Sequence, residues 1–516
     1  MTARVIIVAT GQTGPTTPAT GIALTDAGGY FTSGHVEGAL QEEAAARVAH
    51  AAAADPHPGY LTPAEGNAAY DALGATGVEA VLRAAADAAE VTARNSAIAA
   101  QHTADISLFV PVFNPVFYGA TANGTTNDGT AIASAISAAS AAGGGVVYFP
   151  AGTFAVTTTI VLPSNVALVG AGRRDSFLTL AAAAANSTSI VTTTSTDKTQ
   201  IRDLGFKGAS KAGAAINTVT ATDCLIERCW FDATSGWAVF CNTSSKYVRL
   251  VNSIIEGTRT SNGMEVNNSS YCGMVNCHVK GATSAGFEDY YNQSGESVGN
   301  YALGNTIESC VNGINSHGAT SALYNNNVIR NCSNYGLNGT NGEYITTKYG
   351  EFCQAVGNSF IACASAGMLL NDSTRGWTVS GDATGTTAGP GWYLSGDAHQ
   401  VSVTATNCYA EGVLVYSGSS RLTLLATVTD CSNISIGGRA GINNQGTYSR
   451  LLGCTVRDTR GTKRHSYGIQ SSGADVVMIG GHAMQASARS SRSSSQAFDL
   501  RWSATSKSST PQPLAS

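Results

Sequence analysis

The stretch that decides the fold of this chain runs from residue 128 to residue 154 and reads Asp128-Gly-Thr-Ala-Ile-Ala-Ser-Ala-Ile-Ser-Ala-Ala-Ser-Ala-Ala-Gly-Gly-Gly-Val-Val-Tyr-Phe-Pro-Ala-Gly-Thr-Phe154. Ile132 and Ile136 lie four residues apart, which predicts a short helix over Ala131 to Ala142 with one apolar face. Asp128 stands where a helix N-cap is expected, and Pro150-Ala-Gly is typical of a tight turn. The stretch therefore predicts a small helix that leads into short strands.

Downstream of this stretch the sequence repeats every two to three dozen residues. Cys408, Cys431 and Cys454 are each 23 residues apart, and Cys310 precedes Cys332 by 22. An independent series of glycines, each before a large apolar residue, has intervals of 23, 27, 23, 31 and 24 residues: Gly263-Met264, Gly286-Phe287, Gly313-Ile314, Gly336-Leu337, Gly367-Met368 and Gly391-Trp392. A third, looser series places asparagine after an apolar residue: Val251-Asn252, Val275-x-Cys277, Leu303-x-Asn305, Val356-x-Asn358 and Ala405-x-Asn407.

Each repeat contains three short β-rich runs separated by Gly, Asn and Ser, without a helical period. A unit of this size cannot bury a core alone, so it must stack on its neighbours. We therefore expect an all-β solenoid, a right-handed parallel β-helix, with coils about 4.8 Å apart. The recurrent cysteines are then buried reduced thiols rather than disulfide or metal ligands, and the recurrent asparagines form turn ladders.

Residues 117–154 resemble the entry segment of the pectate-lyase-like β-helix superfamily, where Asp-Gly-Thr opens a capping helix and Gly-Gly-Gly-x-Val-x-x-Pro-x-Gly-x-Phe forms the first coil. Upstream, two segments resemble linker motifs of bacteriophage tail fibres and tail appendages: Val36-Glu-Gly-Ala-Leu-Gln-Glu42 and Asp55-Pro-His-Pro-Gly-Tyr-Leu-Thr-Pro-Ala-Glu65. Together with the β-helix entry, they make the chain similar to a phage tail spike or tail fibre. That resemblance implies a homotrimer, a virion location at the tail, and a host-surface polysaccharide as partner.

On this interpretation the chain has four parts. Residues 1–54 form a small N-terminal region that attaches to a phage tail or baseplate protein, and residues 55–106 form a linker with a helical segment. Residues 107–502 form the β-helix, and residues 503–516 a mobile C-terminal tail. The helical segment has a coiled-coil pattern at Val81, Ala84, Ala88, Val91, Asn95 and Ile98. The alternative is a solvated Ala-rich helix packed on the β-helix.

Composition and charge narrow the range of partners. Only 12% of the residues are charged, and the net charge is −5. This balance gives no electrostatic reason for binding nucleic acid or an anionic membrane. The first residues carry too short an apolar run for a Sec signal peptide, and no stretch is long enough for a membrane span. We expect a protein that is extracellular as part of the virion.

The β-helix register predicts a column of outward-facing side chains, because the residue after each buried apolar position points to solvent. The column contains Asn217, Phe240, Glu265, Glu288, Asn315, Asn338, Leu369 and Tyr393. Glu265 and Glu288 are consecutive in it, so their carboxylates are expected roughly 5 Å apart. Asp289, the next residue in sequence, is a third candidate catalytic residue beside the two glutamates, and His317 lies on the following coil. Carboxyl groups at that separation suit a retaining glycosidase with one acid and one nucleophile.

The residues also leave other interpretations open. The two glutamates could splay into solvent or contact a neighbouring subunit. A polysaccharide lyase would use a base such as Tyr290, Tyr291, His317 or Lys348, but no acidic cluster has calcium-ligand spacing, and hydrolysis is favoured over elimination. No metal and no cofactor are expected. Sugar stacking is predicted at Trp377, Tyr393 and Tyr416, and His317 is also expected to bind carbohydrate, whereas Trp392 is expected to face inward.

Three functions compete on this evidence. Attachment to the host by binding envelope polysaccharide, without cleavage, is favoured. A tail spike that also depolymerises the glycan comes second. A secreted bacterial polysaccharide-degrading enzyme comes third, since no signal peptide is evident and the tail-like motifs at 36–65 favour a virion protein.

Overall fold

The computed structural model describes residues 111–480, apart from 209–210, 233–235, 258–260, 292–296, 341–349, 433–439 and 461–466. It also describes the backbone of 482–483, 486–488 and 498–502, and the single positions 42, 45, 48, 49, 90, 93 and 94. The predicted attachment region, coiled coil and C-terminal tail therefore lie outside the described residues, except for those single positions. The chain divides into two compact units, Met1–Leu108 and Phe109–Ser516, and the β-helix belongs to the second.

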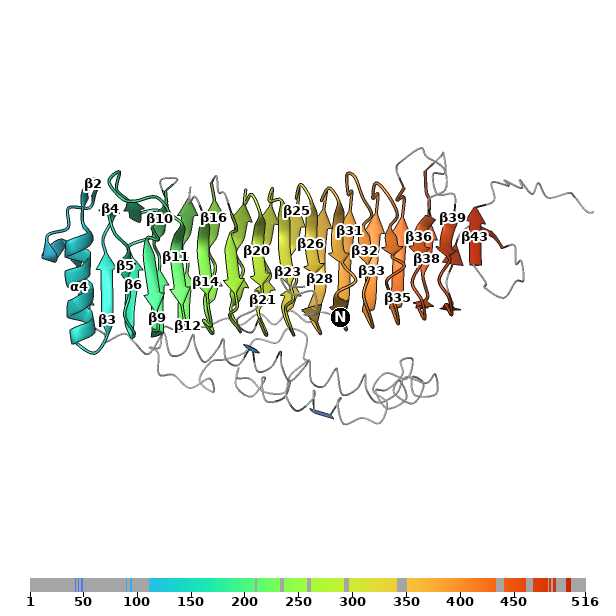
Figure 1. Ribbon diagram of the computed structural model, residues 1–516, viewed down its shortest axis with the longest axis horizontal. Helices are drawn as coiled ribbons and strands as arrows, with labels where there is room; N and C mark the ends of the chain where they lie inside the picture. Colours follow the sequence, from blue (N-terminus) through green and yellow to red (C-terminus); the bar gives the residue numbers. More distant parts are fainter. Residues whose placement is uncertain are drawn as a thin grey trace, which may run out of the picture. The chain divides into compact units, whose positions relative to one another are not determined.

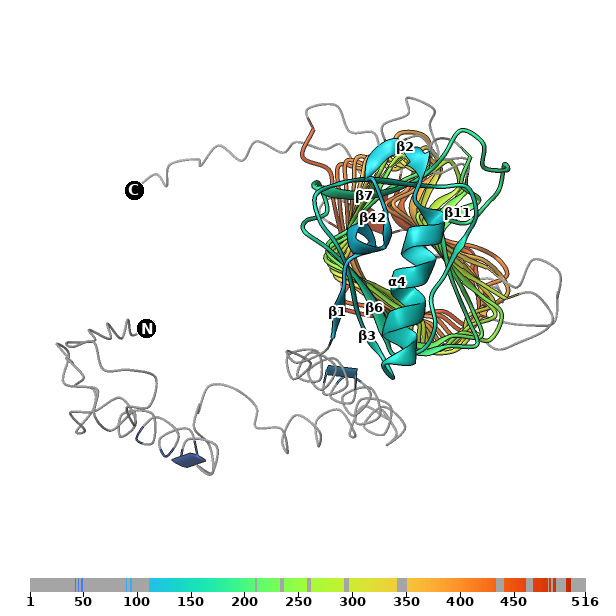
Figure 2. The same ribbon diagram turned by 90° about the vertical axis from the view of Figure 1, so that its left-hand side faces the viewer.

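The second unit is a right-handed parallel β-helix of about 13 turns, which confirms the predicted fold class. The coils follow one another along the long axis, in chain order, from α4 toward β43 (Figure 1). Seen from the N-terminal end, the strands outline a closed cross-section with α4 lying across it (Figure 2). Each coil contributes strands to three faces, called faces A, B and C below.

Face A is formed by β1 (Val112–Phe113), β3 (Gly145–Phe149), β6 (Val166–Gly170), β9 (Asp197–Arg202), β12 (Thr222–Glu227), β15 (Arg249–Val251), β18 (Gly273–Val275), β21 (Tyr301–Leu303), β24 (Leu323–Asn325), β37 (Arg450–Leu452) and β40 (Val477–Ile479). Face B is formed by β2 (Asn123–Asn127), β4 (Gly152–Val156), β7 (Ser176–Leu180), β10 (Gly205–Lys207), β13 (Trp230–Asp232), β16 (Ile254–Glu256), β19 (His278–Lys280), β22 (Thr306–Glu308), β25 (Val328–Arg330), β38 (Thr455–Arg457) and β41 (His482–Ala483). Four longer strands continue from face A into face B: β28 (Gln354–Ile361), β31 (Thr378–Thr384), β33 (Gln400–Thr406) and β35 (Thr423–Thr429). They join the two faces into one 26-stranded sheet.

Face C is a separate 15-stranded sheet. Its parallel strands are β5 (Ile160–Val161), β8 (Val191–Thr194), β11 (Ala214–Val219), β14 (Trp237–Asn242), β17 (Met264–Asn267), β20 (Ala285–Tyr290), β23 (Asn312–His317), β26 (Tyr335–Thr340), β29 (Ala366–Leu370), β32 (Trp392–Leu394), β34 (Val413–Val415), β36 (Ala440–Asn444) and β39 (Tyr467–Ser471). The sheet ends with β43 (Phe498–Trp502), antiparallel to β39, and β42 (Ala486–Ala488). A small extra sheet pairs β27 (Gly350–Glu351) with β30 (Thr374–Arg375).

The N-terminal end of the solenoid is closed by η2 (Pro115–Tyr118) and α4 (Gly129–Ala141). The predicted helix is confirmed, and Ile132 and Ile136 are on its buried face. Asp128 occupies the N-cap position, but its carboxylate bonds to the preceding loop instead of the helix. It accepts hydrogen bonds from the Thr121 backbone N–H at 2.7 Å and from the Ala122 N–H at 3.2 Å. No helix in the described part of the chain is long and apolar enough to cross a membrane.

The glycine series marks face C, as the spacing predicts. The residues that follow these glycines pair in register on successive strands and are fully buried: Met264, Phe287, Ile314, Leu337, Met368 and Trp392. A Cβ atom at Gly313 would lie 2.4 Å from the Gly336 carbonyl oxygen, and one at Gly263 equally close to that of Gly286. Glycine recurs here because neighbouring coils approach too closely for a side chain.

The cysteines are all buried and free, as expected. The Cys408 backbone N–H donates to the Cys431 sulfur at 3.4 Å, so these two residues form a ladder. Cys454 is not part of it, contrary to the spacing. Thr427 pairs with Thr455, so Cys454 lies opposite Ala426 at another corner of the coil. The loop after β35 is longer than the loop after β33 in the preceding coil. A further 23 residues therefore end at an earlier corner of the next coil, and Cys454 lies there.

Asparagines form an internal ladder at the corner between faces A and B. The Asn305 side chain donates to Asn327 at 2.9 Å, and Asn327 donates to Asn358 at 3.0 Å. The three residues are almost completely buried. Asn407 does not belong to this ladder: it follows β33 with a φ of 52°. Asn327, which the sequence pattern did not include, completes the stack.

Candidate functional site

The outward column of face C follows the register expected from the sequence. Backbone pairing links, in order, Asn217, Phe240, Glu265, Glu288, Asn315, Asn338, Leu369 and Tyr393. Successive members of the column are therefore separated by about 4.8 Å, the spacing between paired strands. The column brings residues from positions 217 to 393 onto one continuous strip.

Glu265 and Glu288 lie opposite each other on β17 and β20 and share a partner. The Asn262 side-chain amide donates to Oε2 of Glu265 at 2.8 Å and also to Oε2 of Glu288. The Asn262 carbonyl oxygen accepts from the Ala285 backbone N–H at 2.7 Å, which aims the amide nitrogen at the glutamates. The Asn262 amide nitrogen thus donates to both carboxylates, which places the two groups close to each other.

Glu265 is the more enclosed of the pair, with 8% of its surface exposed. Burial raises the pKa of its carboxyl above the ordinary value, and the negative charge of Glu288 raises it further. Hydrogen bonds from Trp237, Asn262 and Asn267 oppose this shift. The Glu265 carboxyl therefore retains its proton to a higher pH than an ordinary glutamate does.

Glu288 is bound on its other side by His317. The His317 Nε2 atom lies 3.2 Å from Oε1 of Glu288, and the Nδ1 atom lies 2.9 Å from the Thr340 hydroxyl. Tyr290 contacts the imidazole edge-on, with 5.8 Å between ring centroids. Asn315 donates to Glu288 at 3.4 Å. The arrangement places a proton-retaining carboxyl, a second carboxylate and an imidazole side by side, which are the groups used in general acid–base chemistry.

Asp289 does not join the two glutamates, contrary to its selection as a catalytic candidate. Strand side chains alternate, so Asp289 points into the solenoid and has no exposed surface. Its carboxylate accepts hydrogen bonds from Ser297, from Asn300 at 3.0 Å and from Tyr324 at 2.8 Å. Burial raises the pKa of this carboxyl too. Its role is to complete an internal polar cluster.

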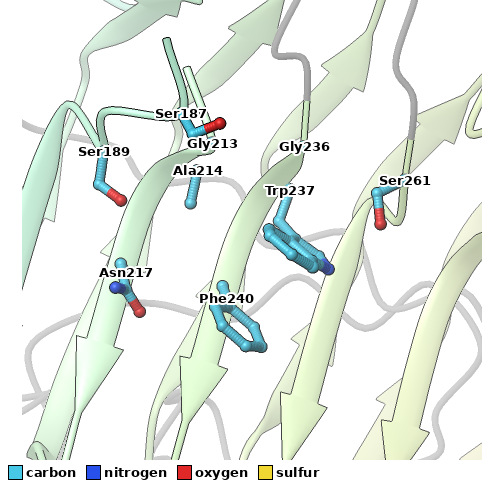
Figure 3. Close-up of a pocket in the computed structure, with 9 residues that line it drawn as sticks. All are labelled: Ser187, Ser189, Gly213, Ala214, Asn217, Gly236, Trp237, Phe240 and Ser261. Atoms are coloured by element: carbon cyan, nitrogen blue, oxygen red, sulfur yellow. The ribbon is translucent and has the colours of Figure 1, made fainter. Parts of the chain in front are cut away.

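A pocket of about 370 Å³ lies immediately upstream of Glu265 on face C (Figure 3). It is lined by Ser187, Ser189, Gly213, Ala214, Asn217, Gly236, Trp237, Phe240 and Ser261. The Trp237 and Phe240 rings stack at 4.5 Å between centroids and 14° between planes. The Trp237 indole N–H donates to Oε2 of Glu265, so the pocket and the acidic pair are one site.

Trp237 is a site residue that the sequence pattern did not reveal. Strict alternation would place it on the same side as Val239, which points inward. In β14, however, both Ala238 and Val239 are buried, and the interruption turns Trp237 outward. Two lining residues, Gly213 and Gly236, pack backbone to backbone, since a Cβ atom at Gly236 would lie 1.8 Å from the Gly213 carbonyl oxygen.

Farther along face C, Tyr393 and Tyr416 stack at 5.7 Å between centroids and 29° between planes. Tyr416 is 43% exposed. Trp377, predicted to stack on sugar, is instead fully buried, and its indole N–H donates to the Gly350 carbonyl at 2.9 Å. It lies at the corner before β31, where the side chain points into the core. Trp392 faces inward, as predicted.

Two of the residues considered for an elimination mechanism, Tyr290 and His317, adjoin the acidic pair, whereas Lys348 lies outside the described residues. Within residues 111–480 as described, no group of three or more His, Cys, Asp or Glu side chains is placed to hold a metal ion.

Residues 112–338 match the family model described as rhamnogalacturonase A/epimerase, pectate lyase-like. A curated relative, the mannuronan C5-epimerase AlgE3 of Azotobacter vinelandii, is 43% identical over 76 residues. That alignment covers 13% of this chain and 4% of the relative, so the chain matches only a small part of that protein's length.

Several solved structures share the fold. The mannuronan C-5 epimerase AlgE6 A-module of Azotobacter vinelandii has a TM-score of 0.51 at 19% identity, with 71% of this chain and 99% of that chain covered. The N-terminal fragment of gene product 12 from bacteriophage phi29 has a TM-score of 0.50 at 16% identity, covering 76% and 74%. The tailspike of E. coli bacteriophage HK620, solved with a pentasaccharide, has a TM-score of 0.50 at 13% identity, covering 69% and 75%. These similarities and the family model confirm a pectate-lyase-like parallel β-helix, a fold that phage tail spikes share.

Proposed function

We propose that this chain is a phage tail-spike protein that attaches to its host by binding a surface polysaccharide along face C. The observation that carries the proposal is the Trp237–Phe240 pocket, whose indole N–H donates a hydrogen bond to Glu265 of the acidic pair. Stacked aromatic rings beside carboxylate and amide groups suit a sugar ring, which has an apolar C–H face and a hydroxyl rim.

Two further points support this proposal. The HK620 tailspike is described in complex with a pentasaccharide, and the AlgE6 module is named for a reaction on mannuronan, so proteins with this fold bind glycans. The tail-like motifs at 36–42 and 55–65 favour a virion protein over a secreted enzyme. On this proposal residues 1–54 attach to the phage tail or baseplate.

Binding is tested by titrating the full chain with mannuronan, polygalacturonate and envelope polysaccharides of candidate host bacteria in a calorimeter. We expect one of these polymers to bind, and Trp237→Ala to weaken the affinity at least about tenfold, the effect of losing roughly 1.4 kcal/mol. Tyr448→Ala is the matched control, because Tyr448 is 62% exposed but precedes β37 on another side of the coil. Equal losses in the two variants would contradict the proposed site.

Cleavage of the bound glycan is a second candidate function, favoured by the unequal environments of the two glutamates. Glu265, with its raised pKa, would donate a proton to the glycosidic oxygen. Glu288 would act as nucleophile, as expected for carboxyl groups about 5 Å apart. Elimination at a uronic acid is the alternative chemistry, with His317 or Tyr290 as the base.

Products distinguish these reactions. Hydrolysis releases new reducing ends without ultraviolet absorbance, whereas elimination also creates unsaturated uronates that absorb. Glu265→Gln and Glu288→Gln should each abolish cleavage while leaving polymer binding. Binding without products from the wild-type chain would identify a receptor-binding protein alone, and full activity in both variants would place the chemistry elsewhere.

The tail-spike proposal also includes a homotrimer. The tail-like motifs support it, and light scattering tests it: we expect a particle about three times the 52.6 kDa chain mass. A monomer at micromolar concentration would contradict the tail-spike assignment and leave the glycan site on face C to be judged by the binding experiment.

A further inference from the structure

We propose that the Tyr393–Tyr416 pair is a second contact point for the same polysaccharide chain, so that face C binds an extended stretch of about six sugar units lying parallel to the solenoid axis. This inference rests on the proposed function, because it concerns the length and direction of the glycan bound there. It makes face C a site for the interior of a polymer rather than for a terminal sugar.

The register supplies the distance between the two aromatic pairs. Phe240 and Tyr393 belong to one column and are separated by six backbone pairings. At ~4.8 Å for each pairing, the two residues are about 29 Å apart along the axis. One hexose unit in an extended chain is close to one coil rise in length, so successive sugars can follow successive coils.

The column between the aromatic pairs is predominantly polar. After the two glutamates come Asn315 and Asn338, whose side chains are linked to each other at 3.5 Å and, through Asn315, to Glu288 at 3.4 Å. Leu369 is the single apolar member of this part of the column. The result is a row of amide and carboxylate groups, which suits the hydroxyl groups of a glycan backbone.

The downstream pair has the same chemistry as the upstream pocket. Tyr393 and Tyr416 form a stacked, partly exposed aromatic surface, and Asp372 contributes a carboxylate beside it that accepts a hydrogen bond from Ser395. Burial raises the pKa of the Tyr393 hydroxyl, with Tyr416 and Asp372 adding to the shift, so this hydroxyl stays protonated and able to donate. Each end of the strip thus combines an aromatic surface with an acidic side chain.

Two contact points joined by one ligand produce a dependence on length. A short oligosaccharide reaches only one aromatic pair, whereas a chain that spans both gains the second contact at a high effective concentration. We expect the affinity to change little from about two to four sugar units and to rise about tenfold or more once the chain exceeds about six units.

The experiment uses the polymer that binds in the titration above, cut by partial acid hydrolysis and separated by size. The full chain and its Tyr393→Ala/Tyr416→Ala double variant are titrated with each fraction. The double variant should bind the shortest fractions as the wild type does and lose the tenfold gain for the longer ones. Tyr247→Ala/Tyr271→Ala is the matched control, since this stacked and exposed pair lies at the corner before face A.

The outcomes separate this inference from the proposed function. Failure of every polymer to bind would overturn both. Binding that depends on Trp237, with the same affinity for trisaccharides and for longer chains, would overturn only the extended strip. A length dependence that survives in the Tyr393→Ala/Tyr416→Ala variant would place the second contact elsewhere and overturn the role given to these tyrosines.

Discussion

Glu265 and Glu288 face each other across one strand pairing, and their proximity has a consequence for stability. The pKa of Glu265 is raised in the folded chain relative to the unfolded one, so the folded state binds the proton more tightly. Its contribution to stability is greatest below the unfolded pKa and is lost as the pH rises through the folded pKa. Glu265→Gln mimics the protonated form and should remove this dependence.

We therefore predict that Glu265→Gln melts at the same temperature as the wild type near pH 4 and at a higher temperature near pH 7. Thermal unfolding followed by circular dichroism at several pH values measures the difference. Asp289, whose pKa is also raised by burial, contributes a similar slope in both proteins and cancels in the comparison. A constant difference in melting temperature at all pH values would contradict the raised pKa of Glu265.

Asn262 is the residue that allows the two carboxylates to coexist. Replacing it with alanine removes the shared donor, so the pKa of Glu265 should rise further. NMR titration of ¹³C-labelled glutamate measures that pKa in Asn262→Ala and wild type. Asn267→Ala is the control: its amide donates to Glu265 through a longer hydrogen bond, at 3.2 Å, so its effect should be smaller. An unchanged or lowered pKa in Asn262→Ala would show that the shared hydrogen bonds do not stabilise the charged form.

At the residue scale, the sequence predicts side chains that obey strict alternation and misses those that do not. Glu265 and Glu288 were found because each follows a buried apolar residue in a regular strand. Trp237 was missed because two consecutive buried residues interrupt β14, and Trp377 was misplaced because it lies at a corner. Corners do not alternate, and their side-chain directions depend on the neighbouring coil, which spacing alone does not reveal.

At the scale of the element, the glycine column predicts where face C tolerates no side chain. Gly313→Ala would bring a Cβ atom to 2.3 Å from Ile329 Cγ2 and 2.4 Å from the Gly336 carbonyl oxygen. Overpacking of this kind costs about 1–3 kcal/mol. Urea unfolding should show that loss in the free energy of unfolding.

The matched control for Gly313→Ala is Gly385→Asn. Gly385 has a φ of 64° and no atom within 4 Å of the place that a Cβ atom would occupy, and asparagine tolerates that backbone region better than other residues with a side chain. We expect a change of less than about 0.5 kcal/mol there. Equal losses at the two positions would mean that the column of glycines does not reflect close coil packing.

The ladders show how far repeat spacing can be used at this scale. Cys408 and Cys431 are neighbours because their interval equals one coil, but Cys454 has the same interval and lies at a different corner. The spacing between two residues counts loop residues as well as strand residues. A coil with a longer loop can therefore place a cysteine at a different corner while the spacing between the cysteines stays the same. The glycine series was more reliable because it also specified the apolar residue that must follow.

For the whole solenoid, the ends are the positions where stacking stops. Within the two large sheets, every strand between the ends is paired on two sides. An end coil instead exposes backbone N–H and C=O groups and the edge of the core, which favours association with other chains. At the N-terminal end α4 covers this edge by burying Ala131, Ile132, Ala135, Ile136 and Ala139. The helix that the opening stretch encodes therefore protects the solenoid as well as beginning it.

This role predicts different effects for the two sides of α4. Ile136→Asp puts a charge on the buried face, and its desolvation should displace the helix from the end of the core. Because the coils below remain paired, we expect far-ultraviolet circular dichroism to keep its β signature while light scattering detects particles larger than the wild-type assembly. Ser137→Asp introduces the same charge at an exposed position of the same turn and should leave the particle size unchanged. Loss of all β structure in Ile136→Asp would show instead that α4 is needed to nucleate the solenoid, and wild-type size with intact structure would show that the end of the core needs no cover.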